Sequence, residues 1–284
     1  MNGRILRRLP VAAVSALTTA QTYATVRRHA PGGGVRWERA NHAGDTVTLL
    51  AGPAVVAGLV VGTVVADRLP WARRIALASL ITGIGAVGAY DDLYGAAGIK
   101  GLRGHLRALG SGEVTSGTVK FAVIPAAGMS CAVLLGRGRS TVLLDGALVA
   151  TTANLVNLLD LRPGRALKVV VVPCAAALGS AGGQLAAPAL GACAAALPED
   201  LAGKAMLGDC GANALGAAVG CLVVSAVPTP WRVLALAAVS ALTLASERVS
   251  FTAVIERHPV LSRIDAWGRS PARRHVDPRR QPGA

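Results

Sequence analysis

The sequence is short of charged and aromatic residues. Of its 284 residues, 15% are Asp, Glu, Lys or Arg and 3% are Phe, Trp or Tyr, whereas 52% are hydrophobic. A soluble domain usually carries about 25% charged residues. A soluble protein with deeply buried helices is the alternative, but too many of the apolar runs here lack a polar face. The shortage of charge therefore predicts a protein that crosses a membrane several times.

Acidic residues are scarce relative to basic ones, 15 against 29, so the formal net charge is +14. In a soluble protein this excess would suggest binding to nucleic acid. No stretch of the chain interleaves basic with aromatic residues as a nucleic-acid surface does. We therefore attribute the charge to loops that face anionic membrane lipids, and we expect no nucleic acid among the partners.

Cysteine pairs with the spacing of a metal site are missing as well. The chain has five cysteines and no Cys-x-x-Cys motif, and all but Cys210 lie inside apolar runs. We interpret them as small packing residues rather than as disulfides or metal ligands. The other four are Cys131, Cys174, Cys193 and Cys221.

Apolar runs are abundant, and their lengths are close to the roughly 20 residues that cross a bilayer. They predict an all-α fold, a polytopic membrane helix bundle of about nine transmembrane helices. The first run also fits a cleaved signal peptide, but the topology of the later spans requires it as a retained helix. The expected spans are 9–26, 46–66, 73–90, 117–136, 142–159, 168–182, 183–198, 211–228 and 231–246.

Basic residues indicate how such a bundle is oriented. One set of loops, together with the C-terminal tail, holds 19 of the Lys and Arg residues, and the opposite face holds nine. The positive-inside rule makes the first set cytoplasmic, with the N-terminus outside and the C-terminus cytoplasmic. We expect three parts: a transmembrane bundle over 1–246, an amphipathic cytoplasmic segment over 247–267, and a disordered basic tail over 268–284.

Polar residues gather at the cytoplasmic ends of the spans. In "GAYDDLYG", Asp91 and Asp92 end an apolar run, where the helix dipole disfavours carboxylates. Adjacent helical residues point about 100° apart, so the two cannot share one task. Either one of them binds Mg²⁺ beside a phosphate-orienting group, or both are solvated and pair with Lys100 or Arg103.

Two more polar clusters lie on the same face. In "NLVNLLD", Asn154, Asn157 and Asp160 follow one helical stripe, which fits a site for a polar headgroup or nucleotide, or hydrogen bonds between helices. In "MLGDCGANALG", Asp209 comes just before a span, where it fits either a helix N-cap or a ligand of Mg²⁺. Each cluster taken singly leaves both alternatives open.

Two basic side chains on this face are further candidates. Lys100 belongs to a basic, glycine-punctuated loop that either neutralises phosphates or only carries the charge that sets orientation. His258 belongs to the amphipathic segment, where it is either a substrate contact or an ordinary surface histidine.

The order of the motifs "DDLYG…IKGLRGH", "NLVNLLD" and "GDCGANALG" resembles that of the polyprenyl-phosphate N-acetylhexosamine-1-phosphate transferases, glycosyltransferase family 4. This superfamily includes phospho-N-acetylmuramoyl-pentapeptide transferase and undecaprenyl-phosphate GlcNAc-1-phosphate transferase. The resemblance covers roughly residues 47–246. It departs from the family where "DLRPGR" puts Pro163 at the place of a second aspartate, and where the family's histidine cluster near the end is missing.

The resemblance implies a phosphoglycosyl transferase in a bacterial plasma membrane, with its active site on the cytoplasmic face. A polyprenyl phosphate would attack a UDP-sugar and release UMP in cell-envelope glycan biosynthesis. It implies Mg²⁺ held by Asp209 and Asp92, with Asp91, Asp92 and Asp209 catalytic. It leaves open whether the chain forms a homodimer. The implied substrate-binding residues are Lys100, Asn154, Asn157, Asp160 and His258.

Two other functions compete with this one. A catalytically inactive relative would act as a membrane scaffold or regulator. A small-molecule transporter would place polar groups near the bilayer midplane and would show repeat symmetry, whereas the polar groups here lie toward one face and no repeat is apparent.

Overall fold

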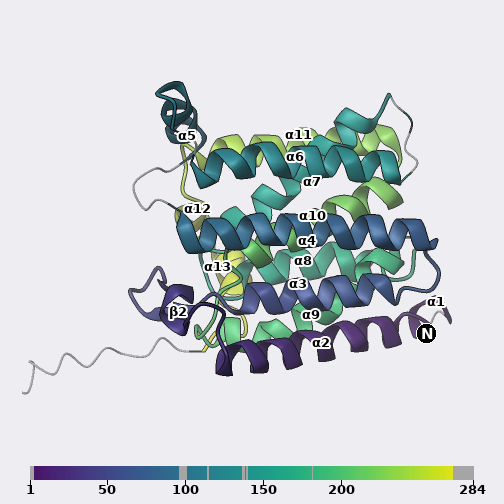
Figure 1. Cartoon of the computed structure of the whole chain (residues 1–284), viewed down its shortest axis with the longest axis horizontal. Helices are drawn as coiled ribbons and strands as arrows, with labels where there is room; N and C mark the ends of the chain where they lie inside the picture. The colour runs from purple at the N-terminus through teal and green to yellow at the C-terminus, as the bar shows by residue number, and fades with distance from the viewer. Residues whose placement is uncertain are drawn as a thin grey trace, which may run out of the picture.

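The computed structural model describes residues 3–95, 101–113, 115–135, 138, 140–180 and 182–270. Its long helices lie side by side with similar axes and form one bundle (Figure 1). These are α2 (Leu9–Arg28), α3 (Ala51–Val64), α4 (Trp71–Tyr94), α6 (Ser116–Leu134), α7 (Val142–Leu159), α8 (Arg165–Ala177), α9 (Gly183–Leu201), α10 (Gly208–Ala226) and α11 (Thr229–Ser246). The short elements are α1 (Gly3–Leu6), η1 (Gly34–Trp37), β1 (Glu38–Ala40), β2 (Thr46–Thr48), α5 (Gly101–Gly110), α12 (Phe251–Arg257) and α13 (Pro259–Ala266).

Five helices of the described ranges are long and apolar enough to cross a membrane: α4, α6, α7, α10 and α11. The protein is therefore a mostly helical, membrane-embedded protein. Each of the nine expected spans overlaps one long helix. Because α3 has 14 residues and α8 has 13, these two are short for a crossing. The number of spans and the sides of the termini stay predictions.

A small β-hairpin interrupts the otherwise helical fold. The sequence predicted a loop over 27–45 and a span beginning at 46, but β1 and β2 pair antiparallel there, and α3 begins only at Ala51. The Asn41 side chain accepts the N–H groups of Ala43 and Asp45, which closes the turn. The backbone N–H of Thr48 donates to the Lys204 oxygen, and the Thr48 oxygen accepts the N–H of Met206. The hairpin is thus bonded to the chain just before α10.

Helix α10 forms the centre of the bundle, and most of its side chains are buried. It packs most extensively against α7 and also contacts α4, α3, α9 and α8. A Cβ added to Gly216 would lie 2.6 Å from Ala153, and one added to Gly220 would lie 2.7 Å from Val149, so only glycine permits this spacing. Because α10 runs antiparallel to α4 and α7, its first turn meets the last turns of both at one end of the bundle.

The C-terminal helices α12 and α13 lie at this same end, near the hairpin (Figure 1). Asp265 accepts two hydrogen bonds from the Arg165 guanidinium, at 2.8 and 2.9 Å, and Lys168 donates to its backbone oxygen at 2.7 Å. Val260 and Trp267 are 67% and 77% exposed. The division of the chain into three parts stays a prediction.

We expect acidic pH, or Asp265→Asn at neutral pH, to release this segment. Burial alone would raise the pKa of Asp265, but hydrogen bonds from Arg165 and Arg269 outweigh it and lower the pKa. A lowered pKa stabilises docking above the ordinary carboxyl pKa of about 4, and the stabilisation is lost as the pH falls below that value. Hydrogen exchange of peptide 251–266, corrected for intrinsic rate, measures the release. Glu256→Gln is the control, because the exposed Arg162–Glu256 ion pair contributes little stability. An equal effect of both substitutions would contradict the prediction.

Candidate functional site

Two carboxylates and one lysine meet where α4 ends and α6 and α10 begin. The Lys120 Nζ lies 3.3 Å from Oδ2 of Asp91 and also contacts Oδ2 of Asp209. The three side chains are between 11% and 21% exposed, so they are shielded from bulk water yet accessible from the end of the bundle. We call Asp91, Lys120 and Asp209 the carboxylate–lysine cluster.

Lys120 is the residue that sequence reasoning missed. It lies in the first turns of the expected span 117–136, outside both sets of loops whose basic residues indicate orientation. A lysine in an apolar span is costly unless it is paired, and that cost is the signal that points to a buried partner. The structure supplies two such partners from helices distant in sequence.

Asp92 points away from the cluster and has a different task. Its two carboxylate oxygens accept the backbone N–H groups of Asp209 and Cys210, each at 2.9 Å. Asp160 accepts the N–H of Gly208 at 2.9 Å. Two carboxylates thus cover the N–H groups at the buried N-terminus of α10, where the helix dipole favours negative charge.

These contacts correct one expectation and bear on two others. The N-cap interpretation of Asp209 is wrong, because Leu207 occupies the N-cap position and the α10 N–H groups bond to Asp92 and Asp160 instead. The expectation that Asp92 ligates Mg²⁺ stays a prediction; each of its two oxygens accepts one N–H group of α10. The residues of the expected stripe also differ in their contacts, because Asp160 caps α10 whereas Asn154 and Asn157 do not. Burial, reinforced by the Asp200 carboxylate, raises the pKa of Asp160.

Asp91 and Asp209 are the residues whose arrangement fits a divalent cation. Within the described residues, no three His, Cys, Asp or Glu side chains form a group that would hold a metal ion. Mg²⁺ is commonly bound by one or two carboxylates together with substrate phosphates and water, so two suffice. Asp91 and Asp209 already converge on one cationic group, the Lys120 ammonium. Their oxygens are the ligand type that Mg²⁺ prefers.

Two glycines make this convergence possible. A Cβ added to Gly88 would overlap the backbone oxygen of Asp209, so the close approach of α4 to α10 requires glycine at this position. Gly208 has φ +60°, in the left-handed region that favours glycine, and a Cβ there would lie 2.7 Å from the Asp92 carboxylate. Gly88 and Gly208 therefore allow α4 and α10 to approach closely enough for Asp91 to reach the cluster and for Asp92 to cap α10.

Asn154 and Asn157 lie on α7, near the same end. Helices α6 and α7 are antiparallel neighbours, and Gly128 of α6 faces Gly146 of α7. Lys120 lies eight residues before Gly128, and Asn154 lies eight residues after Gly146. Lys120 and Asn154 therefore lie at about the same depth, near the shared end of the two helices. Both amides are half-buried, and neither makes a hydrogen bond with another residue that the structure describes. Their hydrogen-bonding groups are thus available to a ligand beside the cluster.

The structure describes only one of the two basic candidates, His258. Lys100 falls outside the described residues. His258 is exposed between α12 and α13, and its imidazole makes no hydrogen bond or ion pair with a described residue. The proposed contacts of these two side chains with substrate stay predictions.

No protein-family model matches the chain, and no curated protein is significantly similar to it. The motif resemblance therefore stays an expectation, and the function is inferred from the geometry of the cluster.

The capping role of Asp92 predicts that Asp92→Ala destabilises the fold. Two buried N–H groups would lose their acceptor, at a cost of about 1–3 kcal/mol each, whereas Asp92→Asn keeps one acceptor oxygen and should cost less. Thermal unfolding in detergent, followed by tryptophan fluorescence, measures the change. Asp67→Ala in an exposed loop is the control, and an Asp92→Ala protein as stable as this control would rule out the cap.

Proposed function

We propose that the chain is a phosphoglycosyl transferase that moves a sugar-1-phosphate, of the N-acetylhexosamine type, from a UDP-sugar to a polyprenyl phosphate. An oxygen of the lipid phosphate attacks the sugar-linked phosphorus of the UDP-sugar. A new P–O bond forms to the lipid phosphate, and the P–O bond to the uridine-bearing phosphate breaks. UMP leaves with the bridging oxygen, and the lipid carries the sugar diphosphate. The site would face the cytoplasm of a bacterial cell and serve cell-envelope glycan synthesis.

The observation that carries this proposal is the carboxylate–lysine cluster itself. A semi-buried ammonium held between two carboxylates, at the end of membrane helices, provides both signs of charge where a lipid phosphate and a water-soluble substrate can meet. Mg²⁺ bound by Asp91 and Asp209 would supply charge neutralisation to the diphosphate and to the leaving UMP.

Each residue of the site has a distinct part in this reaction. Lys120 would exchange its contact with one carboxylate for a phosphate oxygen, and so orient the attacking lipid phosphate. The Asn154 and Asn157 amides would bind polar groups of the UDP-sugar. Asp92 and Asp160 act as positioning residues, because they hold the first turn of α10 and hence Asp209. Shielding from water strengthens all of these electrostatic interactions.

A second candidate function is a membrane scaffold without catalysis. It is favoured by one observation: the Lys120 ammonium contacts both carboxylates of the cluster and offsets part of their negative charge without a ligand. A transporter is less well supported, because the polar residues described above lie near one end of the helices.

An assay for released UMP separates these functions. The full chain, purified in detergent, is incubated with undecaprenyl phosphate, MgCl₂ and a panel of UDP-N-acetylhexosamines. We expect UMP release that depends on both the lipid and Mg²⁺. No release with any sugar, beside an active phosphoglycosyl transferase assayed in parallel, would reject the transferase and favour the scaffold.

A further inference from the structure

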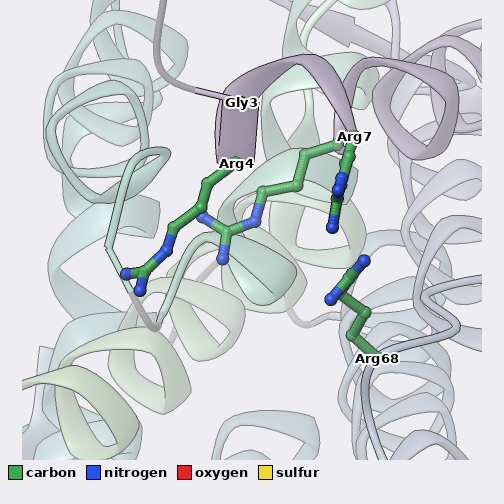
Figure 2. A pocket seen from close by; sticks show the side chains of 5 residues that line it. Gly3, Arg4, Arg7 and Arg68 are labelled. Atoms are coloured by element: carbon green, nitrogen blue, oxygen red, sulfur yellow. The ribbon is translucent and has the colours of Figure 1, made fainter.

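A second concentration of charge lies at the end of the bundle opposite the carboxylate–lysine cluster. A cavity of about 390 Å³ opens there between the N-terminal segment and the loop that joins α3 to α4. Figure 2 shows Arg68 reaching from its own loop toward the segment that carries Arg4 and Arg7. Among the described residues that line the cavity, none is acidic. Its lining residues, which we call the arginine pocket, are Gly3, Arg4, Arg7, Arg8 and Arg68.

Within the described residues, Arg7, Arg8 and Arg68 have no acidic partner. The buried Arg8 donates one hydrogen bond to the backbone oxygen of Leu178, a neutral group. The side chains of Arg7 and Arg68 make no hydrogen bond or ion pair with any described residue. Burial, together with the positive charges of Arg4 and Arg68, lowers the pKa of Arg8. An anion in the pocket would relieve this repulsion.

Another basic cavity in the protein shows the contrast. It measures about 550 Å³, lies beside the β-hairpin, and is lined in part by Arg27, Arg162 and Arg269. These arginines pair with Glu199 at 3.8 Å, Glu256 at 2.7 Å and Asp265 at 2.6 Å. The charge of that cavity is thus balanced within the fold, whereas no such pairs involve Arg7 or Arg68 in the described chain.

Exposed apolar residues lie close in sequence to the arginines of the pocket. Leu6 and Leu9 flank Arg7 and Arg8 in the sequence and are 48% and 46% exposed, and Trp71 at the start of α4 is 62% exposed. Tryptophan at the end of a membrane helix commonly lies at the level of lipid headgroups. The pocket therefore lies at the border between apolar and polar surroundings, where lipid phosphates are found.

We propose that the arginine pocket binds a phosphate-bearing anion at the membrane surface. The planar guanidinium group matches phosphate oxygens with two parallel hydrogen bonds, and several guanidinium groups around one cavity can share the charge of one phosphate. The source of the phosphate is either the headgroup of an anionic phospholipid or a soluble phosphate. This site is separate from the proposed transferase site, so UMP release does not depend on it.

The test uses the full chain, purified in detergent, in two arms. In the first, inorganic phosphate is titrated and binding is followed by calorimetry. In the second, native mass spectrometry counts molecules of phosphatidylglycerol retained by the protein, compared with zwitterionic phosphatidylcholine. We expect Arg68→Gln to weaken binding at least about tenfold, because a charge-assisted hydrogen bond is lost. Arg73→Gln removes the same charge from an exposed position outside the pocket and should change binding less than about twofold.

Each outcome decides the proposal. Binding of the lipid alone would identify a headgroup as the source, and binding of inorganic phosphate as well would show that the phosphate group suffices. No binding in either arm, or an equal loss with Arg68→Gln and Arg73→Gln, would overturn the proposal. If the Arg68 variant does not fold, Arg7→Gln repeats the test from the N-terminal segment, where Arg7 is exposed.

Discussion

Replacing Asp209 by asparagine is expected to lower the rate of UMP release by about a hundredfold or more. The amide would keep the shape of the side chain but lose the negative charge that, with Asp91, faces the Lys120 ammonium. The loss should appear in kcat rather than in KM for the lipid, because the charge is needed where the diphosphate splits. The fold should persist, since α10 is capped by Asp92 and Asp160 and not by Asp209.

The matched control is Glu113→Gln, an exposed carboxylate that precedes α6 at the same end of the bundle. It removes one negative charge from the same face without touching the cluster, and its rate should stay within about twofold of the wild-type rate. Unchanged turnover in Asp209→Asn would mean that the cluster is structural. Equal losses in both variants would mean that only the overall charge of this face matters.

Removing the carboxylate of Asp145 is expected to cause the largest loss of stability. Asp145 at the start of α7 pairs with Arg232 at the start of α11, and the residues are 0% and 1% exposed. In Asp145→Leu, the buried guanidinium of Arg232 would lose its carboxylate, which costs about 3–5 kcal/mol in buried pairs. Thermal unfolding in detergent should show a markedly lower midpoint than for the wild type.

The double variant Asp145→Leu/Arg232→Met separates the cost of an unpaired charge from the cost of lost packing. It removes the stranded guanidinium, and apolar replacement of both partners of a buried pair is often close to neutral. We therefore expect it to unfold at a temperature well above that of the single variant. A double variant no more stable than Asp145→Leu would show that the loss comes from packing and not from the unpaired guanidinium of Arg232.

The helical, membrane-embedded character of the chain follows from local chemistry and was predictable. Apolar runs long enough for a bilayer must form helices, because only a helix satisfies its own backbone groups there. All nine expected spans overlap helices, and five of those helices, within the described residues, are long and apolar enough to cross. The polar residues that separate the apolar runs also indicated the end of the bundle at which Asp91 and Asp209 meet. The hairpin was missed, because its three-residue strands are too short to show a period and depend on pairing with the chain before α10.

The division of tasks between Asp91 and Asp92 could not be read from the sequence. Adjacent helical residues diverge by about 100°, and the rotation of α4 about its axis is set by packing, here by the close approach of Gly88 to α10. That rotation turns Asp91 to Lys120 and Asp92 to the N–H groups of α10. A hydrophobic pattern specifies that a helix forms and which face is apolar, but a helix that is apolar all round leaves its rotation undetermined. The partner of each aspartate is therefore a property of the packed bundle, in which Lys120 lies 29 residues from Asp91 and 89 from Asp209.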